Sequence, residues 1–170
     1  MDVNYINPFL ASTRNVFDKM IHVSFSLGKP YLKRPQERLH KLFQTSASIV
    51  LSGPGDGLIV FHLTRGAALA LASGISGGAI TAMDADCFDA LGEIVSMIAG
   101  GAKKDLPGGQ FSISTPKILR AYAIQYPANI PVIAIPADTG VGRFLLEVAV
   151  APRPPALVEL GAASNAPAAA

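Results

Sequence analysis

The sequence predicts an α+β fold in which helices pack on one antiparallel or mixed β-sheet. Three observations predict it. Segments of helical and strand periodicity follow one another in the order α-β-β-β-α-α-β-β-β along the 170-residue chain. A glycine-rich turn at residues 53–57 joins two strand-like segments as a hairpin. A central helix at residues 89–103 carries an apolar arc that can bury against a sheet.

The N-terminal part of the chain predicts one helix followed by three strands. Asn7 and Pro8 open the helix, with Asn7 as the N-cap and Pro8 at the first helical position, and the helical spacing continues to about residue 21. Residues 22–27 alternate like a strand, and a basic, Pro-interrupted loop or edge follows at residues 29–41. The other two strands flank the hairpin turn: residues 44–51 and 57–63.

Helical signals dominate the middle of the chain. Thr64 is placed to cap an Ala- and Leu-rich helix that ends near Gly74. Asp84 and Asp86 open the central helix, and a lysine pair at residues 103–104 closes it, so that both ends carry the charge that the helix dipole favours.

The C-terminal part predicts three more strands and a tail. The strand candidates are residues 110–115, 130–136 and 143–150. The last of them is predicted to be half-buried, with two alternating sets of side chains: Phe144, Leu146, Val148 and Val150 against Arg143, Leu145, Glu147 and Ala149. Pro and Ala dominate the end of the chain, which predicts one domain over residues 1–151 and a disordered tail over residues 152–170.

Composition narrows the class of protein. A net charge of +2 argues against nucleic-acid binding, and the apolar runs are far shorter than the roughly 18 to 20 residues of a membrane span. The N-terminus lacks the basic start and apolar stretch of a signal peptide. Cys87 is the one cysteine, which rules out an internal disulfide and suits a reducing compartment. We therefore expect a soluble, cytoplasmic protein without nucleic-acid or membrane partners.

No metal site or known hydrolase pattern is predicted. His22, His40 and His62 lie in three separate elements without the spacing of metal ligands, so we expect structural or surface roles for them. Cys87 falls on the first turn of the central helix and is expected to be a core residue. The turn at residues 53–57 lacks the Gly-Lys-Ser/Thr ending of a phosphate-binding loop.

The central helix separates into two faces at about 100° per residue. The apolar arc consists of Leu91, Ile94, Val95, Ile98 and Ala102. The opposite side carries polar and small residues: Asp89, Glu93, Ser96 and Gly100, with Met97 at its edge. A carboxylate, a hydroxyl one turn away and little side-chain bulk suit this side for close approach by another molecule.

The segment Asp89-Ala-Leu-Gly-Glu93-Ile-Val-Ser96-Met-Ile-Ala-Gly100-Gly-Ala-Lys103 resembles the signature helix of the CheC/CheX/FliY chemotaxis phosphatases, and CheX most closely. Further similar segments are Asn7-Pro8-Phe9, Thr115-Pro116, Ile130-Pro-Val-Ile-Ala-Ile-Pro136 and Gly140-Val-Gly-Arg-Phe144. The resemblance extends over about residues 5 to 151. It implies a CheX-like sandwich, a homodimer, and removal of phosphate from the aspartyl-phosphate of a CheY-type response regulator.

The resemblance also implies how such chemistry works. The regulator supplies Mg²⁺ and a lysine, so no cofactor of the protein's own is expected. In the family's Glu-x-x-Asn motif, the acid grips the regulator's lysine and the Asn amide orients an in-line water. Glu93 stands at the position of the acid, which makes Glu93 and Ser96 the catalytic candidates. The exposed face of the helix makes four residues the candidates for contact with the receiver domain: Asp89, Glu93, Met97 and Gly100.

Ser96 departs from the family motif, because Asn is expected three positions after the acid. A seryl hydroxyl is shorter than an amide and holds its donor and acceptor on one atom. By analogy with the removal of one preorganised hydrogen-bonding group, the loss of rate is about 10²- to 10³-fold. None of the other acids in the chain is followed three positions later by Asn or Gln, so the chain holds no second copy of the motif.

Three functions stay open on the sequence. The first is a phosphatase that works slowly through Ser96, and the second is a non-catalytic module that docks on a receiver domain through Glu93. The third is a dimeric scaffold with an idle helix face. The basic residues of the loop at residues 29–41 either form a solvated surface or steer an acidic receiver domain toward the protein: Lys29, Lys33, Arg34, Arg38 and Lys41.

Overall fold

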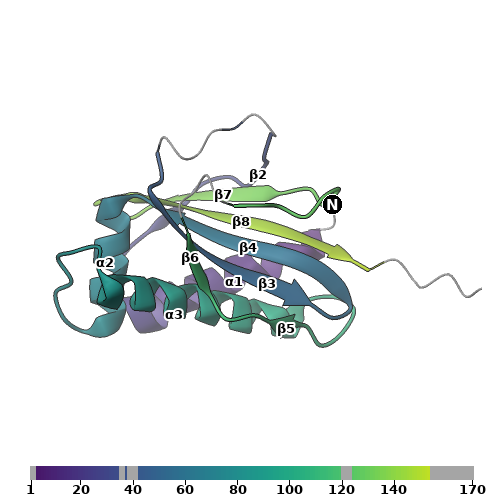
Figure 1. Ribbon diagram of the computed structural model, residues 1–170, viewed down its shortest axis with the longest axis horizontal. Coiled ribbons are helices and arrows are strands. Elements are labelled where there is room, and N and C mark those ends of the chain that lie inside the picture. The colour runs from purple at the N-terminus through teal and green to yellow at the C-terminus, as the bar shows by residue number, and fades with distance from the viewer. Residues whose placement is uncertain (1–2, 35–36, 38–41, 120–123, 154–170) are drawn as a thin grey trace, which may run out of the picture.

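The computed structural model describes residues 3–34, 37, 42–119 and 124–153. One β-sheet lies over three α-helices, all of which cover the same face of the sheet (Figure 1). The hydrogen-bonded order of the strands is β1-β7-β8-β4-β3-β5, with β2 paired to β7 and β6 paired to β3. Every strand pair in the described residues is antiparallel. The predicted α+β class is therefore confirmed, in its antiparallel form.

The helices correspond to those predicted, although their ends differ: α1 (Asn7–Val16), α2 (Arg65–Ser76) and α3 (Ala85–Ala102). A π turn (Phe17–Ile21) continues α1. Short 3-10 segments lie before α1 (Val3–Tyr5) and after α3 (Lys103–Asp105). The strands are β1 (Ser26–Leu27), β2 (Tyr31–Leu32), β3 (Thr45–Ser52), β4 (Gly55–Leu63), β5 (Ser112–Ile113), β6 (Lys117–Leu119), β7 (Ile133–Asp138) and β8 (Arg143–Pro152). β2 lies within residues 29–41, which were predicted to be a loop or an edge. β6 was not predicted, because three residues show no alternation.

The ends of α1 correct two predictions. Ile6 is the N-cap in place of Asn7, and no side chain caps the helix, although Pro8 still lies in its first turn. The π turn ends at His22, which has a left-handed φ of 55°. Because the helix ends here, residues 22–25 do not belong to the strand predicted over residues 22–27. The last two residues of that segment form β1 and pair with β7.

Thr64 precedes α2 as predicted, but its side chain does not cap the helix. Its hydroxyl donates to the carbonyl oxygen of Arg143 at 3.1 Å and accepts from the Arg143 N–H at 2.9 Å. The start of α2 is thereby tied to the start of β8. α3 begins after Asp84 as predicted, and the Asp84 carboxylate also caps the helix by accepting a hydrogen bond from the Cys87 N–H at 3.2 Å.

The predicted hairpin forms the middle of the sheet. β3 and β4 pair in register from Thr45 opposite Leu63 to Leu51 opposite Gly57. β4 then pairs with β8 over its whole length. The long strands β3, β4, β8 and β7 therefore lie side by side and offer one continuous face to the helices.

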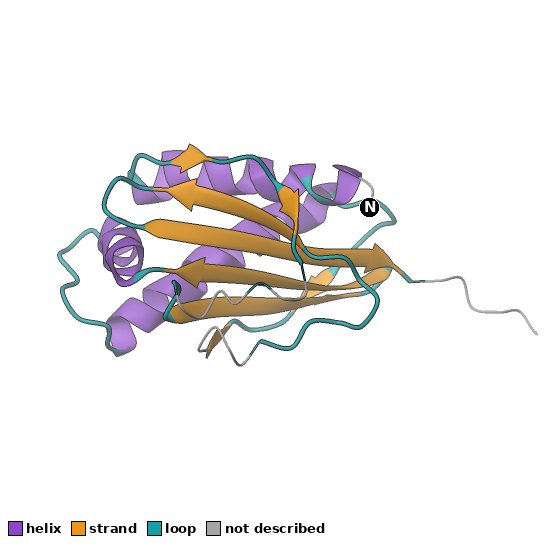
Figure 2. Cartoon of the chain, turned by 90° about the horizontal axis from the view of Figure 1, so that it is seen from above, coloured by secondary structure: helices purple, strands orange, loops and turns teal. Residues whose placement is uncertain are grey.

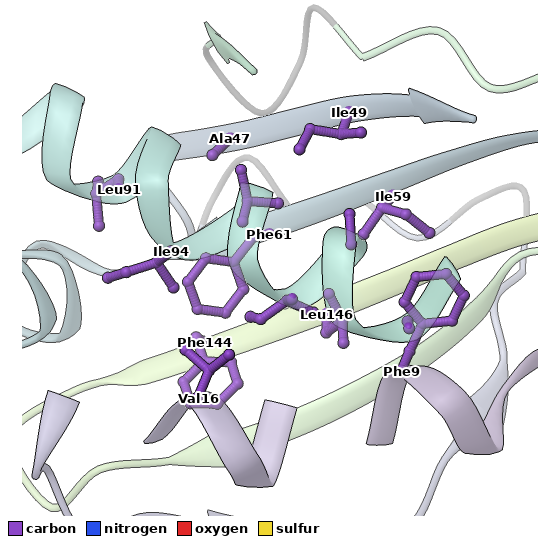
Figure 3. Close-up of a cluster of buried hydrophobic side chains, with 14 of the residues drawn as sticks. Phe9, Val16, Ala47, Ile49, Ile59, Phe61, Leu91, Ile94, Phe144 and Leu146 are labelled. Carbon is purple, nitrogen blue, oxygen red and sulfur yellow. The ribbon is translucent and has the colours of Figure 1, made fainter. Parts of the chain in front are cut away.

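The main core lies between this sheet face and the helices. All five residues of the predicted apolar arc of α3 are fully buried. Figure 3 shows Ile94 of α3 beside Phe61 of β4, in the cluster that also holds Leu91, Phe144 and Leu146. Cys87 is also fully buried, and burial raises the pKa of its thiol, with the Asp84 charge adding to the effect. The expectation that Cys87 is a core residue is confirmed.

Two adjacent glycines of α3 provide a matched test of how α1 and α3 pack. A methyl group on Gly101 would overlap Ser12 Oγ and lie 3.2 Å from Ser12 Cβ, and that hydroxyl is held by a 2.8 Å hydrogen bond to the Ile98 carbonyl oxygen. We expect Gly101→Ala to lower the free energy of unfolding by about 1–3 kcal/mol. A methyl group on Gly100 has no atom closer than Ile113 Cδ1 at 3.9 Å, so Gly100→Ala should raise it by up to about 1 kcal/mol. Urea unfolding of both variants measures the difference, and equal values would contradict this packing.

The prediction that β8 is half-buried is wrong. Every residue from Phe144 to Val150 is buried, and the Glu147 side chain is inaccessible to solvent. One face of β8 contacts the helix-side core, and the other carries Glu147 beneath two segments remote in sequence. We call these segments, residues 29–34 and 124–132, the outer straps; Figure 2 views the sheet from their side. β8 continues to Pro152, and residues 154–170 of the predicted tail lie outside the described residues.

Candidate functional site

The solvent side of α3 is narrower than its sequence predicts. Asp89 and Glu93 are exposed, whereas Ser96, Met97 and Gly100 are half-buried. Met97 packs against the edge of the main core. Within the described residues, no hydrogen bond or ion pair engages the Glu93 carboxylate. Among the described residues, the unpartnered polar groups of this face are therefore the exposed carboxylates of Asp89 and Glu93.

Neighbouring segments border this face on both sides. On one side, the loop after α2 and the first turns of α3 line an open cleft of about 460 Å³, whose lining includes Asp86, Asp89 and Glu93. On the other side lies the segment that holds β5 and β6. Pro116 Cγ is 3.2 Å from the place that a Cβ on Gly92 would occupy, and Ile113 is near Gly100. A partner that approaches Glu93 therefore meets the β5–β6 segment on one side of α3 and the open cleft on the other.

The Ser96 hydroxyl is engaged by its own helix. Ser96 Oγ donates to the carbonyl oxygen of Gly92 at 2.8 Å, one turn earlier. This bond uses the hydroxyl proton, so the oxygen can still accept a hydrogen bond but has no second proton to donate. An amide at this position would keep a donor and an acceptor on separate atoms. The geometry thus makes Ser96 a weaker group for orienting water than its position on the helix suggests.

A buried polar cluster on the outer face of the sheet was missed by sequence reasoning. The Glu147 carboxylate accepts hydrogen bonds from Lys33 Nζ at 3.0 Å, from His62 Nε2 at 3.1 Å and from the Tyr126 hydroxyl. Lys33 Nζ also forms an ion pair with the other carboxylate oxygen at 2.8 Å. Ser46 Oγ lies 2.7 Å from His62 Nδ1 and completes the cluster. Strand alternation placed Glu147 on one face of β8 but gave no sign that this face is covered.

The ionisation of the cluster follows from its contacts. Burial alone would raise the pKa of Glu147, but hydrogen bonds from His62, Lys33 and Tyr126 outweigh it and hold this pKa below its ordinary value. Burial and the Glu147 charge raise the pKa of the Tyr126 phenol. Burial, with the charges of Glu37 and Glu147, raises the pKa of Tyr31 to about 12. Glu147 is therefore ionised, next to the neutral phenols of Tyr126 and Tyr31 and the ammonium group of Lys33.

The described histidines and the described residues of the basic loop have other contacts than the face of α3. His62 belongs to the buried cluster, His22 ends the π turn, and His40 lies outside the described residues. No group of three potential metal ligands occurs in the described part of the chain. Lys33 Nζ forms an ion pair with the Glu147 carboxylate. Lys33 directly follows β2, which lies on the side of the sheet away from the helices (Figure 1). Arg38 and Lys41 lie outside the described residues, so the predicted steering surface is not assembled next to Glu93 by the basic residues that are described.

The family model for the chemotaxis phosphatase CheX matches residues 45–138, which is more than half of the chain and includes all of α3. The chain belongs to the CheX family. A chemotaxis protein CheX from Desulfovibrio desulfuricans is 30% identical, with a TM-score of 0.76 over 86% of this chain and 99% of that chain. A CheC-like superfamily protein from Shewanella sp. PV-4 is 27% identical, with a TM-score of 0.78 over 89% and 99% of the two chains.

Other comparisons define the limits of this assignment. The structure of a CheX–CheY–BeF3–Mg²⁺ complex from Borrelia burgdorferi matches at 22% identity, with a TM-score of 0.72 over 88% of this chain and 99% of that chain, and thus shares the fold. A comparison with curated protein sequences finds no significant match. Among the described residues of this CheX family member, no helix combines the length and the hydrophobicity needed to cross a bilayer.

Proposed function

We propose that this protein docks on a phosphorylated CheY-type receiver domain through the exposed face of α3 and promotes hydrolysis of its aspartyl phosphate. The observation that carries the proposal is the Glu93 carboxylate, which is exposed and unengaged by other described residues in a member of the CheX family. The CheY complex of the Borrelia relative supports the same class of partner. We also propose that the protein is a homodimer in the cytoplasm. Light scattering tests the dimer by its molar mass.

The proposed chemistry needs little from this chain. The receiver domain brings Mg²⁺ and its own lysine, which polarise the acyl phosphate. Glu93 pairs with that lysine and holds α3 over the site. A water then attacks phosphorus as the bond to the aspartyl oxygen breaks, which yields inorganic phosphate and the free carboxylate. Ser96 lies one turn from Glu93, where it can accept a hydrogen bond from the water but not donate one while bonded to Gly92.

The engaged hydroxyl of Ser96 favours a second function, that of a non-catalytic binding module. Because Ser96 donates to the Gly92 carbonyl oxygen, the helix offers no preorganised donor at the position of the family's amide. A protein with this face binds the receiver domain and leaves its phosphate intact. The two functions share the docking role of Glu93 and differ in the rate of hydrolysis.

The lifetime of a phosphorylated receiver domain tests the proposal. We expect the unaltered protein to shorten the half-life of a phosphorylated CheY-type receiver domain, and Glu93→Ala to abolish the effect, because the helix loses its anchor. Release of inorganic phosphate measures both. Asp105→Ala, a change of equal charge in the 3-10 turn after α3, serves as the control and should behave like the unaltered protein. An unchanged half-life with retained binding would leave the non-catalytic function, and absence of both would contradict docking.

A further inference from the structure

The buried cluster around Glu147 has the connectivity of a serine–histidine–acid relay, but its burial excludes that use. Ser46 Oγ contacts His62 Nδ1, and His62 Nε2 contacts Glu147, at 2.7 and 3.1 Å. All three residues are buried, two of them completely and His62 to within 1%. Their side chains lie in the interior of the outer sheet face, so a substrate has no access to the hydroxyl while the straps are in place. The cluster must serve the structure around it.

The direction of its hydrogen bonds shows what holds the cluster together. A carboxylate accepts hydrogen bonds and donates none while it is ionised. His62 Nε2 donates to Glu147, its Nδ1 is hydrogen-bonded to Ser46 Oγ, and the bonds of Lys33 and Tyr126 complete the set. Every donor is satisfied in this arrangement when Glu147 carries its charge. A proton on Glu147 introduces a further donor and leaves the Lys33 ammonium without a counter-charge.

The partners of Glu147 come from three parts of the chain. His62 is on β4, within the sheet, whereas Lys33 and Tyr126 are on the two outer straps. The neighbouring strand β7 faces Glu147 with Ala134, and the phenol of Tyr31 on the first strap lies within the field of the carboxylate. One carboxylate therefore contacts both straps and the sheet, in addition to the backbone pairing of β2 with β7 that holds the first strap at the sheet edge.

The two straps are also bonded to each other. The Lys33 N–H donates to the carbonyl oxygen of Val132 at 2.9 Å. The donor of this hydrogen bond lies on one strap and the acceptor on the other. Lys33 Nζ donates to the Tyr126 hydroxyl at 3.0 Å and lies 4.1 Å from the centre of its ring. Beneath them, Phe43, Ala134 and Leu145 form a small core separate from the main one. The outer face thus has its own contacts and its own core.

We propose that ionised Glu147 acts as a clasp that holds both outer straps on the sheet, and that loss of its charge releases the straps as one unit while the helix-side core stays folded. Such a unit is a region of local opening with a free energy below that of global unfolding. The proposal concerns the face opposite α3 and is independent of receiver binding.

Glu147→Gln tests the clasp at pH 7 in the full chain. The amide of glutamine keeps the shape of the carboxylate, removes its charge and presents donors where the cluster needs acceptors. We expect the exchange of the Lys33 amide proton to become about tenfold faster or more, and the NMR signals of the Tyr126 ring to shift toward those of an exposed tyrosine. Amide protons in the β4–β8 ladder should change by less than about twofold. Asp56→Asn, which removes a charge from an exposed pair with Arg153, is the control and should change neither region.

Two outcomes would overturn the clasp: unchanged exchange of the Lys33 amide in Glu147→Gln, or equal acceleration at Lys33 and throughout the β4–β8 ladder. Lys33→Met provides a second test if Glu147→Gln does not fold, because Lys33 lies at the edge of the layer with its side chain 12% exposed. It should expose Tyr126 on the other strap as well. A Tyr126 signal that stays buried after this change would show that the straps do not move together and would reject the proposal.

The pH dependence of the unaltered protein has a definite sign. Because the pKa of Glu147 is lowered on folding, the clasp contributes fully above the unfolded pKa of a glutamate, about 4.3, and is lost as pH falls through the lower folded value. On acidification, the protection of the Lys33 amide should fall before that of the β4–β8 ladder. Simultaneous loss would contradict a separate opening unit.

Discussion

Replacing Ser96 with Asn is expected to raise the rate of aspartyl-phosphate hydrolysis on a CheY-type receiver domain by about 10²- to 10³-fold. The amide reaches farther than the hydroxyl and holds a donor and an acceptor on separate atoms. It also replaces a group whose proton is engaged by the Gly92 carbonyl oxygen. Phosphate release from the phosphorylated receiver domain, with the variant at catalytic concentration, measures the gain.

Two controls separate the amide from the rest of the helix. Ser96→Ala removes the hydroxyl and adds no amide, and we expect it to leave the rate close to that of the unaltered protein. Combining Ser96→Asn with Glu93→Ala should cancel the gain, because the amide acts only on a docked helix. A loss in Ser96→Ala as large as that in Glu93→Ala would mean that the serine itself positions the water, and no gain in Ser96→Asn would contradict the proposed site.

Reversing the charge at Glu93 is expected to weaken binding to the receiver domain by about 10²-fold or more. Glu93→Lys removes the partner of the receiver's lysine and sets two ammonium groups against each other, which costs several kcal/mol at an interface, with about 1.4 kcal/mol for each tenfold change in Kd. The fold should tolerate the change, because the side chain is exposed and unengaged by other described residues. Titration calorimetry with a receiver domain in its beryllium fluoride and Mg²⁺ form measures Kd.

The matched control keeps the charge change and moves it to another helix. Asp18 is an exposed acid in the π turn after α1, so Asp18→Lys alters the net charge by the same amount. We expect its Kd to stay near that of the unaltered protein, and Asp89→Lys, on the cleft side of α3, to fall between the two. Equal losses of affinity in Asp18→Lys and Glu93→Lys would show that the effect comes from long-range charge, and would reject a specific contact.

Local patterns sufficed for much of the fold and for part of the site. The apolar arc of α3 is buried as its spacing predicts, since a helix with one apolar side has one way to cover it. The hairpin of β3 and β4 follows from a glycine-rich turn between two alternating segments. The end of α1 was less predictable, because a left-handed His22 is not marked by any glycine.

The sequence by itself determined the α+β class, the position of the signature helix and the residue types at positions 93 and 96, because these depend on neighbours along the chain. Tertiary structure alone decided three other features. Ser96 and Gly100 are half-buried beside the β5–β6 segment, Lys33 lies on the face opposite α3, and Glu147 is at the centre of a buried cluster. Each depends on contacts between residues far apart in sequence, and alternation within a strand reports which side a residue faces but not what covers that side.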